Sequence, residues 1–111
     1  MDQGQDDGFY RRYEVLLPLR FNDGSLVPDE LIEQTLEELR QRFGALSRES
    51  QPIEGHGSYF GKTYRDDLLR VFVDVPDTAE NRQFFLEFKE HLKARFAQLD
   101  IWVTTHPLEI L

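Results

Sequence analysis

The segment from residue 54 to residue 67 has the highest density of side chains that could take part in chemistry. Its histidine, His56, has an ordinary pKa that suits a general base near neutral pH. Tyr59, Tyr64 and Arg65 follow it and supply groups that can position an anionic substrate. Glycines interrupt the segment and allow the backbone to bend or to approach a ligand closely. The segment therefore predicts either a catalytic or ligand-binding site, or a glycine-rich hairpin whose tyrosines pack sideways on a sheet.

Other reactive residue types form no recognisable site. The chain has three histidines and no cysteine, and His56, His91 and His106 are far apart in the sequence. A metal ion needs ligands that converge, and these three fall on different predicted elements. Ser58 lacks the flanking glycines of the Gly-x-Ser-x-Gly nucleophile elbow, and the glycine spacing matches no phosphate-binding or dinucleotide-binding loop. We therefore expect no metal and no cofactor.

Hydrophobic periodicity and turn residues predict the elements that must position these groups. Pro28 fits the first position of a helix, Gly44 fits a left-handed cap at its end, and Thr78 fits the N-cap of a second helix. In chain order we expect a strand at 13–20, a helix at 28–44, a weak strand at 45–50, a loop at 51–57, a hairpin tip at 58–65, a strand at 68–75, a helix from about 78 to 96, and a strand at 99–105 that ends before Pro107.

This order is β-α-β-β-α-β, the plan of a ferredoxin-like α+β sandwich with a four-stranded, mainly antiparallel sheet and two helices on one face. We expect the first and third strands to lie side by side at the centre of the sheet and to run parallel. Each helix carries one apolar stripe for packing on the sheet. The stripes consist of Ile32, Leu36, Leu39 and Phe43 in the first helix and Phe85, Phe88, Leu92 and Phe96 in the second.

Strand alternation divides the sheet into two unlike faces. The face that should meet the helices is uniformly apolar and consists of Val15, Leu17, Leu19, Leu69, Val71, Val73, Val75, Ile101 and Val103. The opposite face mixes charges with large apolar groups and consists of Glu14, Leu16, Arg20, Leu68, Arg70, Phe72, Asp74, Trp102 and Thr104. Leaving such apolar groups in water costs roughly 1.5–3 kcal/mol each. We therefore predict an interface that includes Leu16, Leu68, Phe72 and Trp102.

The predicted function depends on what buries the apolar residues of this open face. One alternative is that the hairpin, or the apolar residues Leu108, Ile110 and Leu111, folds across it. The other is a protein partner, which makes the chain a non-enzymatic interaction module that forms a homodimer, by default two-fold symmetric, or docks on a different protein. A small-molecule site at the hairpin is the enzymatic alternative.

Length and charge bound the class of protein. A chain of 111 residues fits a single domain, which we place at 10–111 after a flexible acidic tail at 1–9. The net charge of −8 disfavours nucleic acid and anionic membranes as partners. It also motivates a third hypothesis, an acidic regulator of a basic or nucleic-acid-binding protein. The N-terminus is acidic rather than basic and apolar, so we expect a cytoplasmic protein.

Four segments resemble those of small uncharacterised bacterial proteins of about this length: FNDGSLVPDE, RFGALS, GSYFGKTYRDD and KARFAQLDIWV. The resemblance implies the ferredoxin-like plan and carries no known activity. The general plan also resembles the dimeric ferredoxin-like α/β barrels, whose members pair through their open sheet faces and some of which bind haem or oxidise small molecules. This chain departs from that group because it has no histidine placed to act as a ligand inside the sheet.

Overall fold

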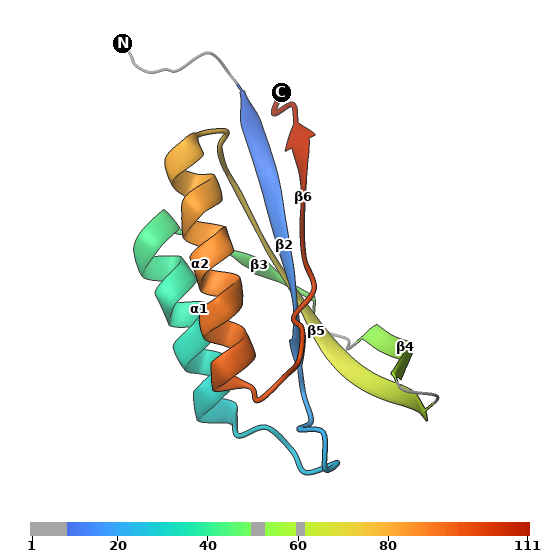
Figure 1. Ribbon diagram of the computed structural model, residues 1–111. Helices are drawn as coiled ribbons and strands as arrows, with labels where there is room; N and C mark the ends of the chain where they lie inside the picture. Colours follow the sequence, from blue (N-terminus) through green and yellow to red (C-terminus); the bar gives the residue numbers. More distant parts are fainter. Residues whose placement is uncertain (1–8, 50–52, 60–61) are drawn as a thin grey trace.

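The computed structural model describes residues 9–49, 53–59 and 62–111, with the backbone alone at 58–59 and 62–66 (Figure 1). The predicted acidic tail lies outside these residues, except for Phe9. In chain order the elements are β2 (Tyr10–Pro18), α1 (Asp29–Phe43), β3 (Ser47–Arg48), β4 (Ile53–Tyr59), β5 (Lys62–Pro76), α2 (Ala79–Arg95) and β6 (Val103–Leu108).

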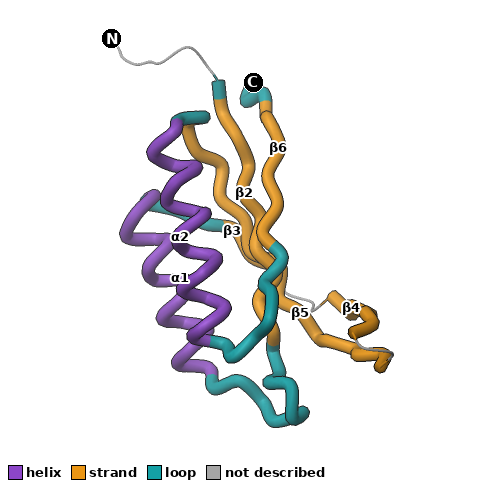
Figure 2. Tube along the Cα trace, viewed as in Figure 1, coloured by secondary structure: helices purple, strands orange, loops and turns teal. Residues whose placement is uncertain are grey.

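The sheet has the strand order β3-β5-β2-β6, and β4 also pairs with β5. Both helices lie on one side of the sheet, which confirms the predicted α+β, ferredoxin-like architecture (Figures 1 and 2). β2 and β5 lie next to each other at the centre, as predicted, but they are antiparallel, with Tyr13 opposite Val73. The expectation of a parallel pair was wrong because the β4–β5 hairpin reverses the chain direction once more after α1.

The hairpin of β4 and β5 is more extensive than the sequence predicts. Ile53 to Tyr59 pair with residues 62–68 of β5, so most of the predicted loop at 51–57 is strand. The ladder between β2 and β5 stops at Pro18 and Leu68, and beyond this point β5 continues with β4 as an arm that leaves the helical layer behind (Figure 1). The sequence did not indicate this strand, because glycine and charged residues, which are rare in strands, make up much of it.

The last strand starts and ends later than predicted. Residues 99–102 precede β6, although the carbonyl of Trp102 already accepts a 3.0 Å hydrogen bond from the N–H of Leu16. Pro107 lies inside β6 and pairs with Arg11, whereas the sequence suggests that it stops the strand. β6 is at the edge of the sheet, where a residue without an N–H is tolerated.

The helix ends follow the predicted capping chemistry. Gly44 has φ of 85°, and its N–H donates to the carbonyl of Arg40 at the end of α1. The hydroxyl of Thr78 accepts a 3.1 Å hydrogen bond from the N–H of Asn81 at the start of α2. Pro28 occupies the N-cap of α1 rather than its first helical position. These caps fix where the two helices begin and end over the sheet.

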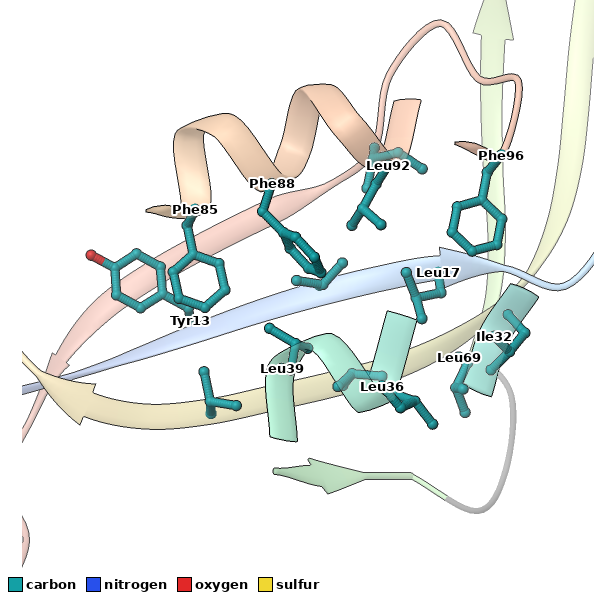
Figure 3. Close-up of a cluster of buried hydrophobic side chains, with 14 of the residues drawn as sticks. Tyr13, Leu17, Ile32, Leu36, Leu39, Leu69, Phe85, Phe88, Leu92 and Phe96 are labelled. Carbon is teal, nitrogen blue, oxygen red and sulfur yellow. The ribbon is translucent and has the colours of Figure 1, made fainter. Parts of the chain in front are cut away.

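The core lies between the helices and the sheet (Figure 3). Both predicted helical stripes face it, with Phe43 partly buried and the other members buried. The ring of Tyr13 stacks on the ring of Phe85 at 4.1 Å between centroids, and Phe88 meets Phe85 edge-on at 6.2 Å. The predicted apolar face of the sheet is therefore the core face, with Leu19 and Val103 at its margins.

An ion pair links the two helices beside this core. The guanidinium of Arg95 donates to both carboxylate oxygens of Glu38, at 3.1 and 2.7 Å, and to the hydroxyl of Thr35 at 2.9 Å. Thr35 is fully buried, and its hydroxyl donates to the carbonyl of Leu31. The ion pair thus fixes the position of α2 against α1. Within the described part of the chain, no helix is long and apolar enough to cross a membrane.

Candidate functional site

The predicted hairpin site falls on β4 and the outer half of β5. The Cα of His56 pairs with that of Arg65, and Gly57 pairs with Tyr64. The imidazole of His56 is 61% exposed and lies 3.6 Å from a carboxylate oxygen of Glu54. The side chains of Tyr59, Tyr64 and Arg65 lie outside the described part of the structure. A catalytic role for these four residues remains a prediction.

The three histidines are on separate elements. His56 is on β4, His91 is on α2 and His106 is on β6, and all three are exposed. Among the residues that the structure describes, no three histidine, aspartate or glutamate side chains are grouped so that they could hold a metal ion.

The open face of the sheet brings together three of the four predicted interface residues. Leu16, Leu68 and Trp102 line one pocket of about 150 Å³, together with Pro18, Gln98, Asp100 and Ile101. Register explains this arrangement, because Leu16 lies between Arg70 and the segment that leads into β6, and Pro18 lies opposite Leu68. We call this group of Leu16, Pro18, Leu68 and Trp102 the apolar patch.

Trp102 is the prominent member of the apolar patch. It is 62% exposed, whereas its neighbour Ile101 is buried in the core on the other side of the sheet. Alternation along an extended chain sends adjacent side chains to opposite faces, so core packing of Ile101 holds the indole outward. The structure thus presents a large aromatic group on the face that has no helical cover.

The C-terminal residues do not cover this patch. Leu108 pairs with Tyr10, at the opposite end of β2 from Leu16, so β6 runs away from Trp102. Ile110 and Leu111 are both exposed. The alternative in which these residues shield the open face is therefore wrong for this structure.

The fourth predicted interface residue, Phe72, lies in a charged part of the same face. Its ring is between two guanidinium groups, with that of Arg12 at 4.2 Å and that of Arg70 at 5.2 Å from the ring centroid. Such cation–π contacts satisfy the aromatic face and shield it from water. Phe72 is therefore half-buried within its own chain and contributes less free apolar surface than Trp102.

The charges around Phe72 are paired with one another. Arg12 donates to both oxygens of Asp74, at 2.7 and 3.0 Å, and these hydrogen bonds raise the pKa of Arg12. Arg70 bonds to Glu14 at 2.7 Å and to Glu49, and these hydrogen bonds raise the pKa of Arg70. Arg12 was not among the predicted residues of this face, although it lies two positions before Glu14 on the same strand and therefore points to the same side. The two arginines are consequently engaged with carboxylates.

The acidic run on α1 is also partly neutralised. Glu33 pairs with Arg48, Glu37 pairs with Arg40, and Glu38 pairs with Arg95. Ion pairs within the chain reduce the negative field that an acidic mimic of nucleic acid needs. Asp29 and Glu30 lie in the first turn of α1, where they also complement the helix dipole. The acidic face therefore has structural roles that account for it.

Comparisons with known proteins indicate the fold. No protein-family model and no curated protein matches the sequence. The structure is similar to CutA1 from Oryza sativa, with 13% identity, 93% of this chain and 83% of that chain covered, and a TM-score of 0.63. The periplasmic divalent cation tolerance protein CutA from Archaeoglobus fulgidus gives 14% identity, coverages of 92% and 86%, and a TM-score of 0.62.

A second kind of solved structure is similar over nearly the whole chain. A phage SAM lyase in complex with S-methyl-5'-thioadenosine gives 12% identity, covers 99% of this chain and 96% of that chain, and has a TM-score of 0.64. The resemblance of four sequence segments to small uncharacterised bacterial proteins predicted neither the CutA proteins nor the SAM lyase as structural neighbours. Because one fold hosts unrelated functions, likeness at such low identity extends to the architecture alone. This chain has the ferredoxin-like fold that the CutA proteins share.

Proposed function

We propose that the chain is a protein-interaction module that forms a homodimer through the open face of its sheet. The observation that carries the proposal is the exposure of Trp102 at the edge of an apolar pocket on the face opposite the helices. Interface centres are enriched in tryptophan next to pockets that it can fill. The apolar patch supplies such a centre.

The charges on the open face support a second copy as the partner. A chain with net charge −8 repels its own copies overall. Beside the apolar patch, however, Arg12 and Arg70 already neutralise the nearby carboxylates of Asp74 and Glu14. Two open faces can therefore approach with little electrostatic cost. A two-fold axis would place the same patch on both sides of the interface.

Sedimentation equilibrium across a concentration series tests the proposal. We expect the wild-type chain to approach twice the monomer mass, and we expect Trp102→Ala to raise the dimer dissociation constant by about 30-fold or more, as for a hot-spot residue of about 2 kcal/mol. Phe9→Ala is the matched control, because Phe9 is 74% exposed but lies just before the far end of β2. We expect the control to dimerise like the wild type.

Two results would contradict the proposal. One is a wild-type chain that remains monomeric at every concentration. The other is a dimer whose dissociation constant is the same in the wild type and in Trp102→Ala, since the two copies would then meet elsewhere. Circular dichroism of each variant verifies that the fold is retained, which we expect because Trp102 is mostly exposed.

A further inference from the structure

A second pocket lies away from the open face, between α2 and β6. Its volume is about 170 Å³, which exceeds the roughly 150 Å³ of an apolar protein cavity that admits benzene. Four residues of α2 line the pocket: Arg82, Phe85, Leu86 and Lys89. They recur at helical spacing and therefore form one stripe along the helix. Tyr13 of β2 and residues 103–105 of β6 complete the lining.

The hydroxyl of Tyr13 is the unusual group in this pocket. It is buried and has no hydrogen-bond partner among the residues that the structure describes. The hydroxyl of the neighbouring Thr105 has other partners, because it donates to the carbonyl of Arg12 at 2.8 Å and accepts from the guanidinium of Arg11 at 3.5 Å. A buried hydroxyl without a partner costs roughly 1–3 kcal/mol, so such groups are rare in folded proteins. The pocket therefore contains a donor that a ligand can satisfy.

The two cations that line the pocket are not equivalent. The ammonium of Lys89 lies 3.1 Å from the carboxylate of Asp100 and is neutralised by it. Arg82 has no ion pair within the described residues, and it precedes Phe85 by one helical turn. Figure 3 shows the hydroxyl of Tyr13 on the side of its ring that faces away from Phe88. Arg82 precedes Phe85 on α2 and lines the same pocket as Tyr13. Among the residues that the structure describes, a cation without an ion pair and a hydroxyl without a hydrogen-bond partner therefore line the same pocket.

The rest of the lining includes three apolar side chains, of which Leu86 is exposed to solvent. Phe85 stacks against Tyr13 and presents a rigid aromatic wall, and Val103 lies on the β6 side. Leu86 is 53% exposed and so lies toward the solvent. Shifts of exposed side chains such as Leu86 and Arg82 cost little, and they would admit a ligand atom to the Tyr13 hydroxyl.

From these observations we infer that the pocket between α2 and β6 binds a small aromatic carboxylate. The carboxylate pairs with the guanidinium of Arg82 and accepts a hydrogen bond from Tyr13, while the ring of the ligand packs among Phe85, Leu86 and Val103. This site is separate from the apolar patch and does not depend on self-association.

Benzoate is a suitable probe, with benzamide as the uncharged ligand of matched shape. In a titration of the full chain followed by ¹H–¹⁵N NMR, we expect saturable shifts at the amides of Leu86, Val103 and Thr105, with a dissociation constant of about 1 mM. Benzamide should bind about tenfold more weakly or not at all. Arg82→Gln should weaken benzoate binding by about tenfold or more, because it removes a charge-assisted hydrogen bond.

Two further variants separate the roles of the lining residues. Arg40→Gln removes the same charge from the exposed surface of α1 and should leave benzoate binding unchanged. Tyr13→Phe should weaken binding several-fold, yet keep or raise the midpoint of urea unfolding, because the wild-type hydroxyl has no hydrogen-bond partner among the described residues to lose. The inference is overturned by an absence of saturable shifts, by equal affinity for benzamide, by an unchanged affinity in Arg82→Gln or Tyr13→Phe, or by a lowered midpoint in Tyr13→Phe.

Discussion

The ion pair between Arg95 and Glu38 should hold the two helices together with a measurable coupling energy. A double-mutant cycle of Arg95→Met, Glu38→Ala and the combined variant measures this coupling energy. Methionine keeps an apolar stem that packs like that of arginine, so the cycle reports on the charged head group. Removal of either partner leaves the other without its opposite charge beside the core.

The magnitude follows from the exposure of the two groups. A hydrogen bond to a charged group contributes about 1.5–3 kcal/mol when buried, and Arg95 makes two to Glu38. The Arg95 side chain is 17% exposed, but that of Glu38 is 40% exposed, so solvent screens the pair in part. We therefore expect a coupling free energy of about 1–1.5 kcal/mol.

Urea unfolding of the four proteins, followed by circular dichroism, measures this coupling, because the free energy of unfolding falls linearly with urea. The control is the same cycle for Arg40 and Glu37, an exposed pair within α1 whose coupling should stay below about 0.5 kcal/mol. A coupling for Arg95 and Glu38 no larger than that of the control would refute the argument that partial burial strengthens the pair.

Three further outcomes follow from the fold. Phe96→Ala should lower the free energy of unfolding by about 3–5 kcal/mol in urea, because the ring is fully buried and the change leaves a cavity. Gly44→Ala should lower the free energy of unfolding, measured by thermal unfolding, by about 1 kcal/mol. The φ of 85° strains a residue that has a Cβ, and because the space around the site is open, no steric clash adds to this strain. Hydrogen bonds from the hydroxyl and N–H of Ser25 lower the pKa of Asp23. The carboxylate therefore stabilises the fold above its unfolded pKa, and this contribution is lost as the pH falls through the lowered value. The difference in urea midpoint between the wild type and Asp23→Asn should accordingly shrink on acidification from about pH 5 to pH 2.

Periodicity was sufficient to predict the layers of the fold. The stripes that contain Leu36 and Phe88 could only be buried by packing on the apolar face of the sheet, and the caps at Gly44 and Thr78 are local signals. Strand limits depend on partners elsewhere in the chain. The strand that includes Gly55 and Gly57 forms because β5 extends to meet it, and no local preference reveals this.

The candidate site was predictable to the extent that it depends on strand alternation. Leu16 and Trp102 could be assigned to the open face by counting residues along their segments. The stacking of Arg12 on Phe72 and the link from Arg95 to Glu38 were not predictable, because each joins elements whose relative position only the folded chain defines. The pocket that contains Tyr13 was not predicted for a related reason. Tyr13 alternates with the other core-facing residues of its strand, and this pattern indicates only that its side chain is buried.

The central position of β2 has a consequence for how fast the chain folds. Arg12 on this strand contacts Asp74 and Thr105, which lie 62 and 93 positions further along the sequence. Closing such long loops costs entropy before the contacts can repay it. Each helix forms from local contacts, but neither can bury its stripe until β2 has found both neighbours. We therefore expect the folding rate to be set by sheet assembly, on the slower timescale of mixed α/β domains rather than that of helical bundles.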